Sequence, residues 1–420
     1  MKHLLLFLAF LGAFTQVHAQ KPQTFTPAKP EEAGFDSRRL ERLDQLLQGF
    51  VNDGIAPHVV TFVARGGKVI HHKAYGYSNL ATRTPLKKDD LFRIASQTKA
   101  LTTVALMILY EEGKCMPEDP ISRYLPEFSQ MSILDSYNPA TGEIKTHPAT
   151  KAITIRHLLT HTAGIPYEHP LDKLPAYEVP FYNSLQPVLL ADVIKKLATR
   201  PLLHEPGEAF TYGLNTDILG RLVEVISGKP LDQFIRERVT EPLGMKDTYF
   251  YLPAEKSGRL VELYAKVSAD STLRLSDHEG NRSFAVKGAK TYFSGGAGMV
   301  GSAEDYARLC QMLLNGGEFN GKRILARKTV DMMLRNQIGE LEVWDRNDHF
   351  GYGFQIFSED SHYGDQASPS SAMWGGMYCS EFTIDPKENL ILLVFTNVHP
   401  YAHYGDFVRK FRVAVYQALL

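Results

Sequence analysis

Apolar residues recur at helical spacing in several stretches of the 420-residue chain. The spacing of three and four positions predicts helices at 37–54, 155–160, 188–198, 215–227 and 407–420. Another helix should start at Ser96 and end at Gly113, because one stripe is formed by Leu101, Val104, Ala105, Ile108 and Leu109. We expect this helix, whose stripe is wholly apolar, to be buried in the middle of the fold. We also expect Asn215 to cap the helix at 215–227 and Gly228 to end it.

Strand signals lie near both ends of the chain. Residues 58–64 and 68–75 are apolar and β-branched, and the Gly66-Gly67 pair between them predicts a hairpin. Later strands are predicted at 352–357, 380–384 and 390–396, and the last two are joined by a turn at 385–389. From residue 116 to about 288 helices and loops dominate, with a long loop at 166–187.

This distribution predicts an α/β (α+β) fold. One antiparallel sheet would be built from the N- and C-terminal segments and flanked by helices, with an inserted, mainly helical region. In a single domain at 20–420, the α/β part would take about 31–112 and 289–420, and the helical insert about 113–288.

The first nineteen residues have the order of a secretory signal peptide. A short basic start at 1–3 precedes an apolar run at 4–14, and a small residue, Ala19, precedes the expected cleavage point. The apolar run is too short to be a stable membrane anchor. We therefore expect an exported protein, either periplasmic or secreted.

The charge balance and the cysteine content limit the partners and sites that we expect. The 46 basic and 47 acidic side chains nearly cancel, which argues against nucleic acid or an anionic membrane surface as the main partner. The three cysteines, Cys115, Cys310 and Cys379, are odd in number and widely spaced. Buried thiols are the favoured interpretation, and a zinc or redox site has little support.

Three stretches carry candidate chemistry. Ser96 and Lys99 lie one helical turn apart, so their hydroxyl and amine share a face, and the helix dipole would favour negative charge near Ser96. Tyr212 ends a turn-rich segment, and a phenol held beside an ammonium group gives up its proton more readily. The segment Trp374-Gly375-Gly376-Met377 leads into a strand, and its glycines would allow another backbone or a ligand to approach closely.

Three short patterns look like functional motifs, but the residues around or within them do not support that interpretation. The Gly-x-Gly-x-x-Gly pattern at 296–301 lies outside any βαβ alternation, so we expect no dinucleotide. His157 and His161 lack the glutamate of a His-Glu-x-x-His zinc motif and are better explained as structural. Residues 76–80 miss the nucleophile-elbow pattern because Leu80 replaces its last glycine. We therefore expect neither a metal nor an organic cofactor.

Taken together, the three candidate stretches resemble the serine β-lactamase-like superfamily, which includes class C β-lactamases, D-alanyl-D-alanine carboxypeptidases and family VIII carboxylesterases. Further segments, 91–96, 154–164 and 298–305, look like signatures of the same superfamily and follow its order. The resemblance implies that Ser96 is the acylated nucleophile and that Lys99 and Tyr212 form the proton-transfer pair. It also implies that the backbone N–H groups of Ser96 and Met377 form the oxyanion hole, with residues 374–377 lining the substrate site.

Two departures from the superfamily pattern bear on the substrate. The Tyr-x-Asn motif is replaced by Tyr212-Gly213-Leu214, with Asn215 one position later. Trp374 stands where β-lactamases have a lysine that meets the antibiotic carboxylate. Without that cation, a carboxylate loses a contact of about 1.5–3 kcal/mol.

The sequence therefore favours the esterase branch, an exported serine hydrolase acting on small-molecule esters or amides through an acyl-enzyme. The alternatives are a β-lactamase or peptidoglycan D-amino-acid peptidase, and an inactive binding protein of the same fold. Which of Lys99 and Tyr212 acts as the base, and the oligomeric state, stay open.

Overall fold

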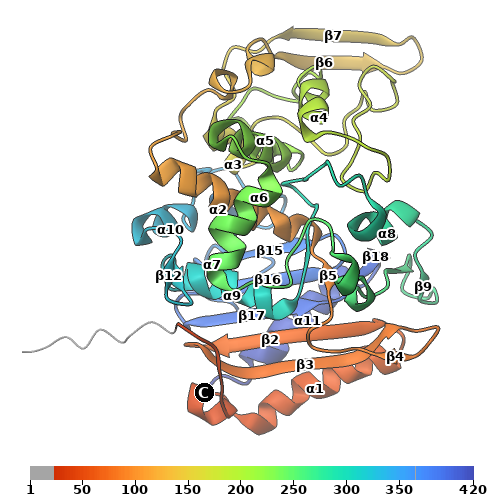
Figure 1. Ribbon diagram of the computed structural model, residues 1–420, viewed down its shortest axis with the longest axis vertical. Coiled ribbons are helices and arrows are strands. Elements are labelled where there is room, and N and C mark those ends of the chain that lie inside the picture. Colours follow the sequence, from red (N-terminus) through yellow and green to blue (C-terminus); the bar gives the residue numbers. More distant parts are fainter. Residues whose placement is uncertain (1–22, 365) are drawn as a thin grey trace, which may run out of the picture.

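The computed structural model describes residues 23–364 and 366–420, and the expected signal peptide at 1–19 lies outside them. A nine-stranded sheet forms the centre of this part of the chain, in the hydrogen-bonded order β1-β3-β2-β17-β16-β15-β14-β13, with β4 attached to β3 (Figure 1). Its strands are β1 Thr26–Pro27, β2 His58–Arg65, β3 Lys68–Asn79, β4 Thr84–Pro85, β13 His349–Phe350, β14 Gln355–Ile356, β15 Ala372–Gly376, β16 Ser380–Asp385 and β17 Leu390–Phe395.

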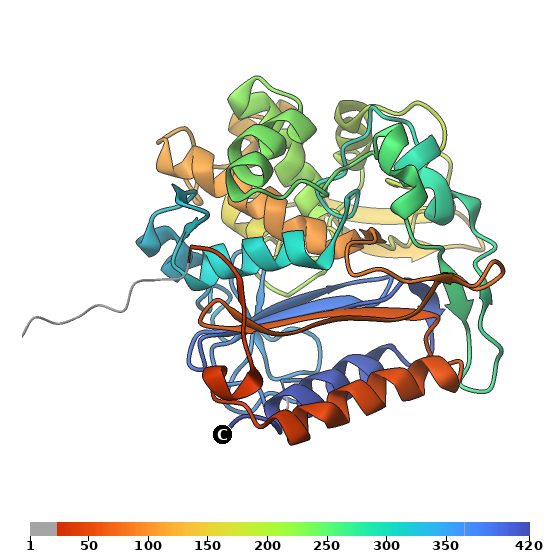
Figure 2. The same ribbon diagram turned by 60° about the horizontal axis from the view of Figure 1, so that its bottom comes forward.

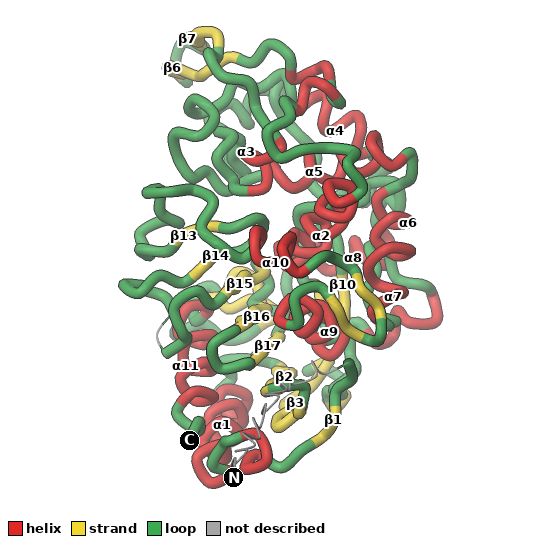
Figure 3. The backbone as a smooth tube through the Cα atoms, turned by 90° about the vertical axis from the view of Figure 1, so that its left-hand side faces the viewer, coloured by secondary structure: helices red, strands yellow, loops and turns green. Residues whose placement is uncertain are grey.

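The two ends of the chain meet inside this sheet. β17 pairs antiparallel with β2, so that Leu390 lies opposite Arg65 and Phe395 opposite Val60. Figure 3 shows the strands following one another in the order of pairing, from β3 through β17 to β13. The fold expected from the sequence is therefore confirmed. One departure is the pairing of β1 with β3, which is parallel.

Helices cover both faces of the sheet. α1 Ser37–Asn52 and α11 Tyr404–Tyr416 pack against one face, and α2 Thr98–Glu111 and α9 Ala303–Leu314 lie on the other (Figure 2). Side chains of β2 alternate between two apolar cores, with Val59 and Val63 on the α1 side and Val60 and Phe62 on the α2 side. Because both faces are buried, these strands are nearly continuous runs of apolar residues.

The remaining elements lie mostly above the sheet. The helices are α3 Ile155–Leu159, α4 Leu190–Leu197, α5 Asn215–Ser227, α6 Leu231–Ile235, α7 Glu241–Leu243, α8 Glu279–Lys287 and α10 Arg327–Met333. The short helical turns are η1 Pro30–Ala33, η2 Ala95–Gln97, η3 Ile121–Arg123, η4 Pro126–Phe128, η5 Arg236–Thr240 and η6 Ala254–Arg259. The minor strands are β5 Phe92–Arg93, β6 Ser132–Asn138, β7 Glu143–Pro148, β8 Tyr264–Lys266, β9 Arg274–Leu275, β10 Val300–Gly301, β11 Glu318–Phe319, β12 Lys322–Arg323 and β18 Val398–Tyr401. None of the helices in the described part has both the length and the apolar character needed to cross a bilayer.

Local expectations differ in accuracy. The hairpin turn at Gly66-Gly67 is confirmed, because both glycines have positive φ angles, and all three cysteines are buried free thiols. β3 runs on to Asn79 through the expected loop, because Tyr77 N–H bonds Pro57 O and extends the ladder. The strand expected at 352–357 shrinks to Gln355–Ile356.

The expected N-cap role of Asn215 is wrong, whereas Gly228 ends α5 as expected, in the left-handed conformation. Leu214 is the capping residue, and Asn215 is the first residue of the helix. The Asn215 amide instead donates to His161 Nδ1 at 2.9 Å and to Ile165 O at 3.2 Å. Burial therefore directs this side chain into the fold, where it finds partners that the local sequence does not reveal.

A buried ion pair ties α11 to the sheet and generates a stability test. Arg412 bonds Glu381, both side chains are at most 3% exposed, and the Tyr363 hydroxyl also donates to Glu381 at 3.0 Å. Glu381→Gln removes the buried carboxylate charge that faces the guanidinium, so we expect a loss of about 3–5 kcal/mol in the free energy of unfolding. Urea denaturation followed by circular dichroism measures it.

The matched control is the exposed pair of Arg327 and Asp331, whose charged atoms are 2.9 Å apart. Asp331→Asn should change the free energy of unfolding by about 1 kcal/mol or less. Equal losses in the two variants would contradict the importance of the buried pair.

Candidate active site

Ser96 lies on a strained turn in front of a buried helix. β5 leads into the 3-10 turn Ala95–Gln97, and α2 follows at once. Ala95 has a φ of +42° although it is not glycine, a conformation that costs about 1–3 kcal/mol and is often found at functional sites. Residues 98–109 of α2 are all buried, as expected from the apolar stripe. The positive end of the helix dipole therefore lies beside Ser96.

The Lys99 amine is 1% exposed and is surrounded by acceptors. Its Nζ lies 2.8 Å from the Tyr167 hydroxyl, 2.8 Å from the Gly296 carbonyl oxygen and 3.3 Å from Ser96 Oγ. An ammonium group would use all three of its N–H donors here. A neutral amine would donate to Tyr167 and Gly296 and direct its lone pair at the Ser96 hydroxyl. These distances allow the amine either to donate to the Ser96 hydroxyl or to accept from it.

Tyr212 is beside Lys99, but through its ring. Lys99 Nζ is 4.6 Å from the Tyr212 ring centroid, and the Tyr212 hydroxyl accepts a hydrogen bond of 3.3 Å from Trp374 Nε1. Within the described residues, the Tyr212 hydroxyl has no hydrogen bond to Ser96 or Lys99. The fold thus brings the three expected groups into one place, with the phenol directed toward the indole.

A second phenol, Tyr167, is closer to the reacting groups, and the sequence did not single it out. It comes from the loop expected at 166–187 and accepts a hydrogen bond of 2.8 Å from Lys99, which also contacts Ser96. Burial raises its pKa well above the ordinary value, with Tyr212 and Asp217 acting in the same direction, so the phenol stays neutral near pH 7. Its place directly after the segment 154–164 was the one signal that could have found it.

The glycine segment closes the other side of Ser96. A Cβ on Gly376 would lie 2.3 Å from Ile94 O, and one on Gly375 would lie 2.4 Å from the Tyr404 hydroxyl. Only glycine therefore lets β15 come this close to the turn that carries Ser96. Neither Ser96 N–H nor Met377 N–H donates to a backbone carbonyl of the described residues. Both donors are available to an oxyanion.

Asp217 fixes the loop that holds Lys99. This carboxylate is 1% exposed and accepts from the Ser294 hydroxyl at 2.6 Å. Burial raises the pKa of Asp217, although Ser294 and the charge of Lys99 act in the opposite direction. Met299 N–H also donates to Thr98 Oγ1 at 3.1 Å, so the loop is joined to the start of α2.

The two histidines that were expected to be structural lie in different settings. His161 is buried under Tyr212, with ring centroids 4.7 Å apart, and burial lowers its pKa well below the ordinary value. His157 accepts from Thr154 N–H at the start of α3, and burial lowers its pKa to about 4. Within residues 23–364 and 366–420, no group of three or more His, Cys, Asp or Glu is placed to hold a metal ion.

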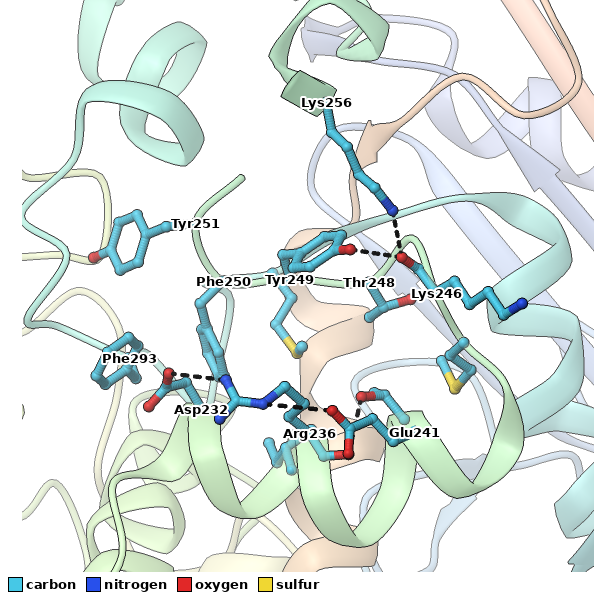
Figure 4. A pocket seen from close by; sticks show the side chains of 14 residues that line it. Asp232, Arg236, Glu241, Lys246, Thr248, Tyr249, Phe250, Tyr251, Lys256 and Phe293 are labelled. Carbon is cyan, nitrogen blue, oxygen red and sulfur yellow. Dashed lines mark hydrogen bonds and ion pairs between the residues drawn. The ribbon is translucent and has the colours of Figure 1, made fainter. Parts of the chain in front are cut away.

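A separate cavity of about 470 Å³ lies between α6–α7 and the segment 245–256 (Figure 4). Among its charged residues, Arg236 pairs with Asp232 and Glu241, and Lys256 pairs with Asp247. Ser96, Lys99 and Tyr212 are not among the residues that line it. The candidate chemistry is therefore outside this cavity.

We compared the chain with protein families, with known relatives and with solved structures. The model of the beta-lactamase family matches residues 43–417. An uncharacterised protein of Mycobacterium tuberculosis is 33% identical over 81% of this chain and 85% of its own length. Esterase EstB of Burkholderia gladioli is 28% identical over 92% of this chain and 98% of its own. The solved structure of EstCE1, described as a hydrolase with promiscuous acyltransferase activity, has a TM-score of 0.75 and 29% identity, covering 90% of this chain and 99% of that one.

Gly296 offers a direct test of the Lys99 contacts. A Cβ there would lie 2.4 Å from Asp217 Oδ2 and 3.3 Å from the Tyr167 hydroxyl. Gly296→Ala must therefore displace the carbonyl that holds Lys99, and we expect Ser96 to react about a hundred-fold more slowly with a fluorophosphonate. Mass spectrometry of the adduct over time gives the rate.

The control is Gly258→Ala, because a Cβ at Gly258 would meet no atom within 4 Å. Its labelling rate should equal that of the unchanged protein. If Gly296→Ala labels equally fast, the Gly296 carbonyl does not position the amine.

Proposed function

Because this chain belongs to the β-lactamase family, we propose that it is a serine hydrolase that cleaves esters through an acyl-enzyme on Ser96. The observation that carries the proposal is the 3.3 Å approach of the buried Lys99 Nζ to Ser96 Oγ, on a turn bordered by the glycine segment of β15. A nucleophile beside a base that other groups hold in place is the general signature of covalent catalysis.

In the proposed reaction, Ser96 Oγ attacks the ester carbonyl carbon and its proton passes to the Lys99 amine. The carbonyl oxygen becomes an oxyanion held by the N–H groups of Ser96 and Met377, each of which is worth about 3–4 kcal/mol of barrier. Collapse of the intermediate breaks the bond to the alcohol, and Tyr212, the other member of the proposed pair, delivers a proton to it. Water then attacks the acyl-enzyme and the proton transfers run in reverse.

Tyr167 would support this cycle without changing its own charge. Its raised pKa keeps the phenol neutral, and it accepts one N–H of Lys99. In the second step an alcohol could replace water, which would make the product a new ester. The description of EstCE1 as a hydrolase with promiscuous acyltransferase activity supports this variant of the reaction.

Trp374 supports ester over β-lactam as the substrate. Its indole is 4% exposed and donates to Tyr212, at the position where the β-lactamase pattern has a cation. A substrate carboxylate would therefore lack a charge-assisted bond of about 1.5–3 kcal/mol. The similarity to esterase EstB supports the same choice.

The substrate preference can be measured directly. We expect kcat/KM for p-nitrophenyl acetate and butyrate to exceed that for a chromogenic cephalosporin by about ten-fold or more, because of the missing cation. Ser96→Ala should abolish turnover of all three. Faster turnover of the cephalosporin would favour a β-lactamase, and the absence of any fluorophosphonate adduct on Ser96 would favour an inactive binding protein.

The two phenols can be separated by matched variants. Tyr212→Phe should lower kcat for p-nitrophenyl esters by about 10²–10⁴-fold, because a proton carrier is lost. Tyr167→Phe removes one of three Lys99 contacts and should lower kcat by about ten-fold. Stopped-flow or steady-state kinetics measure both. A larger loss in Tyr167→Phe would make Tyr167 the proton carrier.

A further inference from the structure

Both tryptophans of the sequence, Trp344 and Trp374, are at the candidate site. Their rings are stacked, with centroids 5.6 Å apart and planes inclined by 20°. Trp374 is 4% exposed, whereas Trp344, from the segment between α10 and β13, is 45% exposed. An exposed tryptophan at the mouth of a site is an unusual use of a large apolar side chain.

Trp344 is held in this position by several contacts. Its ring centroid lies 5.7 Å from that of Tyr212 and 5.8 Å from that of Phe210, and the Arg346 guanidinium carbon is 4.5 Å from its centre. The backbone of Trp344 has a φ of +53°, a left-handed conformation that is costly for a bulky residue. Strain of this kind persists only where the surroundings fix it, and it clusters at ligand sites.

A second apolar surface lies at the oxyanion end of the same strand. Met377, three residues after Trp374, is 37% exposed, and Phe181 in the loop at 166–187 is 40% exposed. The neighbouring Tyr182 hydroxyl donates to Met377 Sδ at 3.4 Å and bonds the Tyr378 hydroxyl at 2.6 Å, which joins this loop to the glycine segment. Trp374 lies within β15 and Met377 directly after its end, with Gly375 and Gly376 between them.

We propose that Trp344 is a specificity-determining residue, forming with Met377 two apolar walls on either side of Ser96. The substrate class that fits is a neutral ester carrying a planar aromatic or bulky apolar group that packs on Trp344. This inference rests on the proposed ester hydrolysis and adds the group that the site selects. Exposed apolar surface on both partners is removed from water when they pack, which is the source of the selectivity.

The first experiment compares substrates that differ only in the acyl group, p-nitrophenyl 3-phenylpropanoate and p-nitrophenyl acetate. Trp344→Ala should lower the ratio of their kcat/KM values about ten-fold, and Trp344→Phe should keep most of the ratio. Benzyl acetate against ethyl acetate, followed by pH titration, tests the alcohol side in the same way. The matched control is Val267→Ala, which removes an exposed apolar side chain outside the site.

The second experiment measures binding without turnover. In the Ser96→Ala variant, ethyl 3-phenylpropanoate should change the tryptophan fluorescence in a saturable way, because both tryptophans of the chain are at the site. Ratios unaffected by Trp344→Ala on both sides of the ester, or no fluorescence change up to the solubility limit, would overturn the inference. Hydrolysis that persists in Ser96→Ala would instead overturn the proposed function, while the fluorescence titration still tests the apolar walls.

Discussion

The arrangement of this molecule depends on one constraint, the burial of the Lys99 amine. An amine that water does not reach must find its acceptors within the protein, because an unpaired buried polar group is costly. Lys99 finds them on the Ser96 turn, on Tyr167 and on the loop that ends at Gly296. Each of these segments is fixed in turn, the last of them by Asp217. Three parts of the chain that are far apart in sequence, at Ser96, Tyr167 and Gly296, are therefore held together around a single nitrogen atom.

The sheet provides the rigid reference for this cluster. β2 and β17 unite the two ends of the chain, both faces of these strands are packed, and β16 joins β15 to them. The glycines of β15 then bring its backbone against the turn of Ser96. The helical region contributes the other half of the site, with Tyr212 and Asp217 at the start of α5. The candidate site therefore lies where the two parts meet, and its geometry requires both.

Sequence patterns predict the parts of this structure that depend on local periodicity. The stripe of α2, the glycine hairpin and the last strands are found within a few residues of their expected positions. The hairpin β6–β7 was not predicted, because its strands are mostly exposed and lack the alternation of apolar and polar residues that indicates a strand. Tyr167 was not predicted for a different reason. Its importance comes from contacts made across the fold, and the loop around it has no hydrophobic periodicity. Asn215 was mispredicted for the same reason. Asparagine is typical of a helix cap, but here its side chain bonds His161, which is far away in the sequence.

In the proposed reaction, Trp374 in the place of a cation would affect both Lys99 and the substrate. A second positive group in the place of Trp374 would be separated from Lys99 by the ring of Tyr212 alone, and two like charges in a buried site disfavour one another. The indole removes that repulsion, and because it is only a donor it also fixes which atom the Tyr212 hydroxyl accepts from. The same ring supports Trp344 at the mouth of the site. In the proposed reaction, the same residue that leaves a substrate carboxylate without a cation also provides an apolar wall, which links the environment of Lys99 to the choice of substrate.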